Sequence, residues 1–442
     1  MKIKLFFTTI IILAFLSACS KDEVDFLPEE NSNQIEELTK KNQYPIQEAI
    51  PEEYIIVFKE SLEEKNINNY EATQREGSQE LLKIQQYYKQ KSLKVLSDNG
   101  LSEKNLSHVY TGAMQGFHAK GVSSEELKKL ETDKRIEYIE PNYIVRINLP
   151  KPENQKGLSE DELLKQTEEN SKMNPIGGGI NTLLANGETL PWGVAYVGRR
   201  AHGGTGRTAW VLDTGIAPHP DLRIRGALSR SFVNGEASWR DLNGHGTHVA
   251  GTIAAKNNGR GVIGVSYGSR VVAVKVLNRS GSGSVAGIIA GIDYVYNRAV
   301  ANDVFNYSIG FRNRSINTSL EVAMRRLAGR RIYGALAAGN NNDNTQFFSP
   351  QRLRTARTWI IGAINRVNKR PIDFSNFGVS VDRWAPGEMV TSTWLNGRYN
   401  TISGTSMASP HVAGILLARG TNSVGSKGFV AKGGHRKPRA KL

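Results

Sequence analysis

The second half of the chain alternates short apolar runs with stretches of helical spacing. The runs are rich in β-branched and small apolar residues and lie at Ala209–Leu212, Val271–Leu277, Val304–Ser308, Tyr333–Ala338 and Trp359–Ile364. Between them, helices are predicted at residues 246–255, 285–297 and 319–330. This alternation favours an α/β fold with a doubly wound, mainly parallel sheet and helices on both faces. Such sheets bind ligands at the carboxyl ends of their strands.

The first half shows a different pattern, which predicts a small α+β domain over residues 51–148. Strands are expected at Tyr54–Phe58, Gly116–Ala119 and Ile136–Pro141, and a helix at residues 78–96. Ser123 and Glu126 form a capping pattern, so a second helix is expected to begin there.

Residues 1–19 have the pattern of an export signal. Lys2 and Lys4 precede the apolar run Leu5–Phe15, which is too short to span a bilayer. Cys19 is the single cysteine, so the chain cannot form an internal disulfide. Its placement after Leu16-Ser-Ala resembles a bacterial lipoprotein signal, which implies a lipid on Cys19 and attachment to the outer membrane or the cell surface. An ordinary secretory signal is the alternative.

Three segments without clear periodicity connect or end these parts. Residues 20–50 are polar and are predicted to be a tether, and residues 149–190 are predicted to be a linker. Residues 421–442 are predicted to be a frayed basic C-terminal tail without regular structure or a function of its own. The α/β domain therefore extends over residues 191–420.

The net charge of +15 conceals an asymmetry along the chain. Residues 191–442 contain 34 Lys and Arg against 11 Asp and Glu, a balance of +23, which leaves −8 for residues 1–190. Basic surfaces often bind nucleic acid, but here the basic residues are scattered and no aromatic residues are interleaved for base stacking. We therefore expect no nucleic-acid partner, and we expect the acidic first half to dock onto the basic second half.

Three motifs carry the candidate chemistry. They are Val211–Ile216 (VLDTGI), Asn243–Gly251 (NGHGTHVAG) and Ser403–Gly414 (SGTSMASPHVAG), and they contain Asp213, His245 and Ser406. A serine nucleophile needs an imidazole to accept its proton and a buried carboxylate to orient that imidazole. Each motif alone is more typical of a strand end, a helix start or a loop. The order Asp, His, Ser matches that of a known serine nucleophile template, and this resemblance implies an Asp-His-Ser triad.

The three motifs resemble those of the subtilisin-like serine peptidases (the subtilase, or peptidase S8, family), and the likeness extends from about Pro191 to Gly414. This resemblance implies that Ser406 attacks the peptide bond, that His245 transfers the proton and that Asp213 orients His245. Ala337–Asn340 resembles the oxyanion motif of the family, which assigns Asn340 to the developing oxyanion. Two runs resemble the edges that bind substrate as an added strand: Ser280, Gly281, Ser282 and Gly283, and Ser308, Ile309, Gly310 and Phe311.

The predicted α+β domain is similar to the inhibitory propeptide of these peptidases. The likeness rests on the strings YIIVFK, GFHA and YIEPN, which begin at Tyr54, Gly116 and Tyr138. The resemblance implies that residues 51–148 inhibit the peptidase domain until they are removed. An unrelated small domain is the alternative, but the position directly before a peptidase favours a propeptide.

Two departures from the family pattern affect what we expect. Phe311 replaces a common glycine and is expected to narrow or cover the pocket for the residue before the cut. The family usually has a further helix and strand where this chain has only its basic tail. A loop over residues 256–262 matches a calcium loop of the family, with Asn258 at a ligand position and Asp221 as the carboxylate. Calcium is therefore a possible structural ion, and catalysis needs no cofactor.

The sequence as a whole predicts an exported serine endopeptidase made as a self-processing zymogen. Its expected partners are protein or peptide substrates, its own propeptide as inhibitor, and the membrane through a lipid on Cys19. The order along the chain implies that cleavage after residue 148 releases the peptidase from its anchor. The alternative is a catalytically impaired surface binding protein with the same fold.

Overall fold

Parallel strands that are apolar on both faces build the main sheet of this protein. The computed structural model describes residues 48–60, 79–147, 181–185, 187–201 and 206–442. In these ranges the sheet has the order β10 (Arg230–Ser231), β12 (Arg270–Lys275), β8 (Thr208–Asp213), β14 (Val304–Tyr307), β15 (Tyr333–Ala337), β16 (Thr358–Ile364), β17 (Val381–Pro386), β21 (His435–Lys441) and β20 (Gly425–Lys432). The strands from β10 to β21 are parallel, and β9 (Arg223–Ile224) adds to β12.

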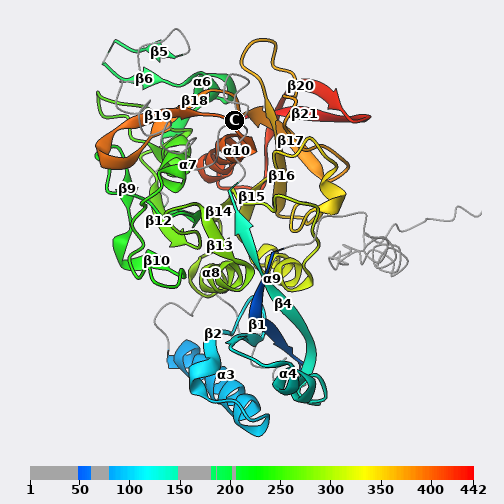
Figure 1. Cartoon of the computed structure of the whole chain (residues 1–442). Coiled ribbons are helices and arrows are strands. Elements are labelled where there is room, and N and C mark those ends of the chain that lie inside the picture. The colour runs from blue at the N-terminus through cyan, green and yellow to red at the C-terminus, as the bar shows by residue number, and fades with distance from the viewer. Residues whose placement is uncertain (1–47, 61–78, 148–180, 186, 202–205) are drawn as a thin grey trace, which may run out of the picture. The chain divides into compact units, whose positions relative to one another are not determined.

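Helices cover both faces of this sheet, as the alternating pattern predicts. The helices α7 (His245–Ala254) and α10 (Thr405–Arg419) lie on one face, and α8 (Val285–Arg298) and α9 (Thr318–Gly329) lie on the other (Figure 1). Successive side chains of β8 divide between the two layers. Val211 packs in the α7–α10 core, whereas Trp210 and Leu212 pack in the α8–α9 core.

The N-terminal domain is the predicted α+β unit. Its elements are β1 (Ala49–Phe58), α3 (Gln79–Asp98), β2 (Leu106–Tyr110), β3 (Gly116–Lys120), α4 (Ser124–Glu131) and β4 (Ile136–Arg146). The sequence analysis missed β2 and ended the last strand too early. The capping box is confirmed, because Ser123 Oγ accepts from the backbone N–H of Glu126 and the Glu126 carboxylate accepts from that of Ser123.

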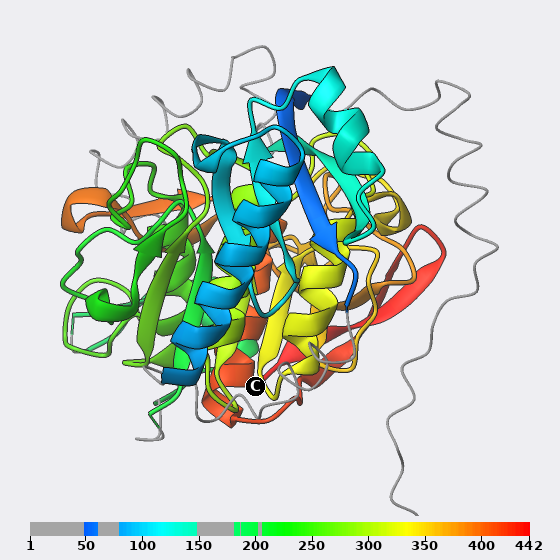
Figure 2. The ribbon, with the colours of Figure 1, turned by 90° about the horizontal axis from the view of Figure 1, so that it is seen from below.

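The antiparallel sheet of this domain has two apolar faces with different partners. Ile56 and Phe58 face a small core that includes Tyr88 of α3. Ile55 and Val57, on the other face, belong to the same buried cluster as α8 and α9. Figure 2 views this domain from below and shows α3 on its outer side. The N-terminal domain therefore has a small core of its own and completes its burial against the α/β domain.

The remaining short elements frame the α/β domain. They are β5 (Thr182–Leu183), β6 (Thr189–Leu190), α6 (Trp192–Val197), β7 (Arg200–Ala201), β11 (Ser266–Tyr267), β13 (Ser282–Ser284), β18 (Val390–Thr393) and β19 (Tyr399–Ile402). β5 pairs with β6, β7 with β11, and β18 with β19. No helix in the described part of the chain is both long and apolar enough to cross a membrane.

The prediction that residues 421–442 form a basic tail without structure of its own is wrong. These residues form the hairpin β20–β21, and β21 extends the main sheet beside β17. The turn is Gly433-Gly434, and both glycines have positive φ, at 57° and 79°. Two-residue hairpin turns of this kind need positive φ at both positions, which glycine adopts without strain. A Gly-Gly pair between basic residues was therefore a turn signal.

Lys432 attaches this hairpin to the rest of the domain. Its ammonium donates to the backbone carbonyls of Ile372, Asp373 and Ser375 at 2.9, 2.6 and 2.8 Å. Burial lowers the pKa of Lys432 to about 8. Hydrogen bonds from a charged donor are stronger than those from a neutral one. We therefore expect the three bonds of Lys432 to stabilise the edge strand β20, most of which is exposed.

We expect Lys432→Met to lower the free energy of unfolding by about 2 kcal/mol, because three carbonyls lose a charged donor. Thermal unfolding of Ser406→Ala protein, with and without the change, measures this without self-digestion. Lys437→Met is the matched control, since that half-buried lysine on β21 donates to one carbonyl, that of Val379. Equal melting temperatures for both lysine variants would show that the hairpin does not depend on this contact.

Candidate active site

Asp213 is the last residue of β8, at the carboxyl end of a central strand of the sheet. Its side chain is fully buried. The backbone N–H of Thr214 donates to Asp213 Oδ1 at 2.7 Å, so the turn after the strand holds the carboxylate. This is where the α/β pattern predicted it, because the carboxyl ends of parallel strands form the binding edge.

His245 is the first residue of α7, and two glycines allow the helix to begin there. Gly244 has φ 109°, a conformation that L side chains rarely adopt. A Cβ on Gly246 would lie 2.2 Å from the Gly215 carbonyl oxygen and 3.1 Å from Asp213, so only glycine allows this close approach. The start of α7 is capped by Asp241, which accepts from the N–H groups of Asn243, Gly244 and Thr247.

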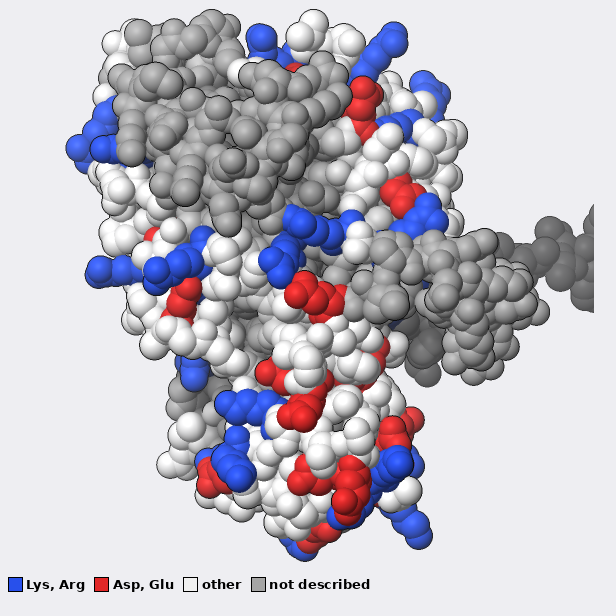
Figure 3. Space-filling view, viewed as in Figure 1, with Lys and Arg blue, Asp and Glu red and all other residues white. Residues whose placement is uncertain are grey.

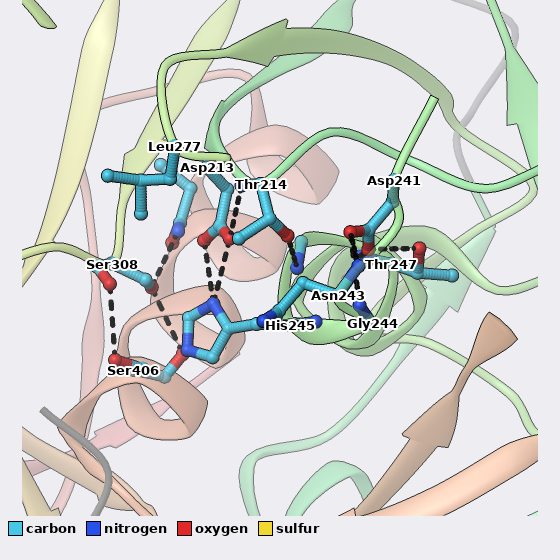
Figure 4. A network of polar contacts seen from close by, with 12 residues as sticks. Asp213, Thr214, Asp241, Asn243, Gly244, His245, Thr247, Leu277, Ser308 and Ser406 are labelled. Atoms are coloured by element: carbon cyan, nitrogen blue, oxygen red, sulfur yellow. Dashed lines mark hydrogen bonds and ion pairs between the residues drawn. The ribbon is translucent and has the colours of Figure 1, made fainter. Parts of the chain in front are cut away.

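His245 and Asp213 form a buried pair. His245 Nδ1 lies 2.8 Å from Asp213 Oδ1 and 3.0 Å from Oδ2, and the imidazole is 1 % exposed. Figure 4 shows the imidazole with one nitrogen toward Asp213 and its opposite edge toward Ser406. The buried Nε2 has no hydrogen-bond partner among the described residues. A carboxylate on Nδ1 fixes the tautomer that leaves Nε2 as a proton acceptor.

Ser406 lies in the first turn of α10, and Ser308 at the end of β14 holds it on both sides. Ser406 Oγ donates to the Ser308 carbonyl at 3.2 Å, and Ser308 Oγ donates to the Ser406 carbonyl at 3.0 Å. The second bond has a clear cause. Pro410, four residues after Ser406 in the helix, has no N–H to give to the Ser406 carbonyl, and the Ser308 hydroxyl takes its place.

Asn340 follows β15 and faces the start of α10. Its side-chain oxygen accepts from both the N–H and the hydroxyl of Thr405, each at 2.9 Å. Thr405 Oγ1 also accepts from the N–H of Gly339 at 3.1 Å. These bonds fix the plane of the amide and assign its oxygen to Thr405, which leaves the NH2 side as the donor side of Asn340.

The predicted substrate edge at residues 280–283 carries an added strand in this structure. The C-terminal part of β4 pairs antiparallel with β13, with Gly283 opposite Val145 and Ser282 opposite Arg146. The N–H of Ile147 then donates to the Gly281 carbonyl at 2.9 Å. A Cβ on Gly283 would lie 2.2 Å from the Val276 carbonyl oxygen, so this edge needs glycine for its own packing.

The second predicted edge, at residues 308–311, directly follows β14. Ser308 contacts Ser406 as described, and the Ile309 carbonyl accepts from Gln351 Nε2 at 2.8 Å. Phe311 is 5 % exposed and belongs to the cluster of the α8–α9 layer. That Phe311 narrows the pocket before the cut stays a prediction.

Besides the pairing of β4 with β13, the N-terminal domain makes polar contacts to α8 and α9. Asp293 of α8 accepts from the backbone N–H groups of Thr111, Gly112 and Ala113 at 2.7–3.1 Å. Burial raises the pKa of Asp293 to about 6, although these hydrogen bonds act in the opposite direction. Glu140 of β4 accepts from the first N–H groups of α9, those of Thr318 and Ser319, both at 2.8 Å.

The candidate calcium region brings Asp221 and Asn258 together. Asn258 Nδ2 donates to Asp221 Oδ1 at 3.1 Å, and the hydroxyl of Tyr399 donates to Oδ2 at 2.7 Å. Glu188, which sequence analysis missed, is fully buried and accepts from the Asn258 N–H. Two buried carboxylates beside an amide are the oxygen donors that calcium prefers. Nowhere in the described ranges do three or more His, Cys, Asp or Glu residues gather to hold a metal.

The other histidines of the motifs pack in the core. His248 is fully buried, with Nε2 2.9 Å from the Val390 carbonyl, and burial lowers its pKa to about 3. His411 of α10 contacts the Met407 carbonyl, and burial lowers its pKa to about 4. His248 is therefore a packing residue in this structure.

Sequence analysis missed the residues that support the site from behind. They are Thr214, Asp241, Lys275 and Thr405, each of which contacts a predicted site residue or its turn. Asp241 had a local signal, because an acidic residue just before a helix start is a common cap. Cys19 lies outside the described residues.

Comparisons with known proteins agree with this geometry. Residues 204–419 match the subtilase family, and residues 53–148 match the peptidase inhibitor I9 family. The M-protease of Shouchella clausii is 36 % identical over 318 residues, which cover 68 % of this chain and 78 % of that protein. Subtilisin Savinase of Lederbergia lenta is 43 % identical over 232 residues, covering 51 % of this chain and 82 % of that protein.

Two further matches extend the comparison. A thermostable alkaline protease of Halalkalibacterium halodurans is 41 % identical over 240 residues, 53 % of this chain and 64 % of that protein. The crystal structure of a cold adapted subtilisin-like serine proteinase shares 33 % identity and covers 57 % of this chain and 97 % of that chain, with a TM-score of 0.49.

The fold and the buried carboxylate–imidazole pair thus define a serine peptidase of the α/β class. The chain belongs to the subtilase family of serine endopeptidases and carries an inhibitor-type propeptide domain before its peptidase domain.

Proposed function

We propose that Asp213, His245 and Ser406 form the catalytic triad of this peptidase and that Asn340 contributes to its oxyanion hole. The observation that carries the proposal is the contact of 2.8 Å between His245 Nδ1 and Asp213, with Nε2 left as an acceptor beside α10. Ser406 loses its proton to His245 and attacks the carbonyl carbon of the peptide. His245 then protonates the leaving amine, and water hydrolyses the acyl-enzyme by the same route in reverse.

One movement precedes the attack in this account. Ser406 Oγ donates to the Ser308 carbonyl, so its hydrogen must turn toward His245 Nε2 before transfer. The oxyanion then forms near the start of α10, where helix N–H groups offer positive potential. The Ser406 N–H and the Asn340 amide, held in orientation by Thr405, are the proposed donors. Removal of one such donor lowers turnover by about 10²–10³ in a related subtilisin.

The strand pairing of β4 supports self-processing. An extended segment that adds to the edge at residues 280–283 follows the path expected of a bound substrate. The hydrogen bond between Ile147 and Gly281 places the end of that strand on the predicted substrate edge. We therefore propose that the first cut falls in the segment after Ile147, and that residues 51–148 afterwards inhibit the enzyme as a bound product.

We also propose that the zymogen is exported and held at the membrane by a lipid on Cys19. A cut between residue 148 and Pro191 then separates the anchor from all residues of the triad, since the first of these is Asp213. An acylated N-terminus with two or more chains stays firmly in a bilayer. The peptidase would thus leave the cell envelope once it separates from the bound propeptide, which stays attached to the anchor.

The replacement Ser406→Ala is expected to lower proteolysis of casein more than a hundredfold and to abolish self-processing, because no other activated hydroxyl replaces it. A casein assay measures the loss of proteolysis. Fractionation of expressing cells, followed by mass spectrometry, measures the loss of self-processing. Wild type should yield a soluble fragment that begins between about residues 149 and 190, while the variant stays full-length in the membrane fraction. Retained cleavage in the variant would contradict the triad, and an active fragment that resists a high-salt wash would contradict release.

Propeptide docking is proposed to depend on hydrogen-bonded carboxylates more than on net charge. The ion pair described between the two domains joins Arg326 and Glu60 at 3.6 Å. The face shown in Figure 3 has carboxylates gathered on the N-terminal domain at the bottom, with Lys and Arg among them. The −8/+23 asymmetry is therefore expected to increase the rate of encounter and to change the rate of release little.

A separate chain of residues 48–147 is expected to inhibit the mature peptidase, with an association rate that falls as salt rises. Glu140→Ala should raise its inhibition constant about tenfold, since two α9 N–H groups lose a charged acceptor. Glu137→Ala is the matched control, because that glutamate lies on the exposed side of β4. Equal inhibition constants for the two variants would remove Glu140 from the docking account.

Calcium is proposed to bind Asp221 and Asn258, together with Glu188. The Asn258 amide would have to turn its oxygen toward the ion, since its nitrogen faces Asp221 in this structure. When bound, the ion would neutralise the two buried carboxylates, and it takes no part in the peptide cleavage.

A chelator is expected to lower the melting temperature of the Ser406→Ala protein, and added calcium should restore it by mass action. Asp221→Asn protein should melt at one temperature with or without calcium, because the main carboxylate ligand is gone. If the Ser406→Ala protein, which retains Asp221, Asn258 and Glu188, gives the same melting curve with chelator and with calcium, the site does not bind calcium.

A further inference from the structure

Lys275 is a fully buried lysine directly behind the proposed triad. It is the last residue of β12 and lies opposite Asp213 in the parallel register of β12 and β8. Its ammonium donates to the Thr214 carbonyl at 2.7 Å and to the Leu277 carbonyl at 2.8 Å. Glu236 Oε2 lies 3.0 Å from the same nitrogen. Two carbonyl oxygens thus accept hydrogens of the ammonium, and the Glu236 carboxylate forms an ion pair with it.

Two of these contacts join parts of the active site that belong to different segments. Thr214 forms the turn that holds the Asp213 carboxylate, and Leu277 begins the loop that leads to the substrate edge at residues 280–283 (Figure 4). The backbone also connects them, because the Asp213 carbonyl accepts from the N–H groups of Val276 and Leu277 at 2.9 and 3.2 Å. Lys275 therefore fixes the distance between the carboxylate turn and the base of the edge.

Glu236 connects Lys275 to the loop that follows Leu277. Its Oε1 accepts from the Arg279 N–H at 3.1 Å, next to the first residue of the predicted edge. The Arg279 carbonyl in turn accepts from Asn243 Nδ2 at 3.0 Å, and Asn243 Oδ1 accepts from the N–H of His245 at 3.2 Å. Hydrogen bonds and the Lys275–Glu236 ion pair thus connect the carboxylate turn, the substrate loop and the start of the histidine helix.

The position of this charge is physically costly. An ammonium removed from water loses several kcal/mol of hydration, and an apolar side chain of similar size would often stabilise the same position better. We propose that Lys275, with its counterion Glu236, is a positioning residue that holds the substrate edge in fixed relation to the Asp213–His245 pair. The proposal rests on the triad assignment and adds to it the residue that aligns bound substrate with the triad.

The test uses the self-processed enzyme, with active sites counted by a serine-directed reagent. Lys275→Met should lower kcat per counted site at least tenfold, because the carboxylate turn and the edge lose their common anchor. Glu236→Gln should raise KM at least threefold for a substrate of four residues before the cut, and leave KM for a single-residue ester unchanged. A longer substrate depends on the edge, whereas the ester does not. Lys437→Met, at the far end of the sheet, is the control.

A merely structural role would move different quantities. If Lys275 only stabilised the fold, its variant would give fewer counted sites and a lower melting temperature, with wild-type kcat and KM for each site. That result would overturn the proposal, as would an equal change in KM for both substrates in Glu236→Gln. Should Lys275→Met yield no folded protein, the substrate-length dependence in Glu236→Gln decides alone. Failure of the triad itself would appear separately, as cleavage by Ser406→Ala.

Discussion

The close approach of the β8 turn to the first turn of α7 is the constraint on which the active site depends. Asp213 ends a strand and His245 begins a helix, and their side chains meet at 2.8 Å. Gly246 permits this approach, because a Cβ there would lie 2.2 Å from the Gly215 carbonyl oxygen. The pair is buried, so water cannot replace the hydrogen bond between the two side chains if the backbone shifts. Asp241, Thr214 and Lys275 each hold one side of this junction through backbone groups.

A second consequence concerns the nucleophile. Pro410 interrupts the hydrogen bonds of α10 near its start, and the Ser308 hydroxyl satisfies the carbonyl that this leaves. The same serine accepts the Ser406 hydroxyl through its own carbonyl. Ser308, directly after β14, thus supports the proposed nucleophile and begins the second predicted substrate edge. Both of its hydrogen bonds to Ser406 would be disturbed by a larger side chain or a shifted backbone, which leaves little freedom for substitution at Ser308.

The propeptide domain binds by adding a strand to β13, as is proposed for a substrate. Its last strand adds to β13 through backbone hydrogen bonds, which do not depend on side-chain identity. Its selectivity comes from elsewhere, namely from apolar side chains of β1 packed on the α8–α9 layer and from carboxylates aimed at helix and loop N–H groups. Because the domain buries one face of its sheet only in this contact, docking and folding of the propeptide support each other.

The sequence by itself determined the class of fold and the order of most of its central elements, and it led to the proposal that Asp213, His245 and Ser406 form a triad. Strand and helix periods are local properties, and the motifs around Asp213, His245 and Ser406 are short contiguous runs. Both can therefore be recognised in a single sequence. The sequence analysis missed β2, β17, β18, β19 and the hairpin β20–β21. β2, β18 and β19 each pair with a strand close in sequence, but they are short and have no clear hydrophobic period. The Gly433-Gly434 turn was a local signal for the hairpin, whose position beside β17 depends on a distant strand. Only the tertiary structure decided that Lys275, Glu236 and Asn243 share one set of hydrogen bonds behind the triad. Their spacing along the chain carries no period or motif, since parallel strands bring residues together by register and by crossover connections, which local pattern does not encode.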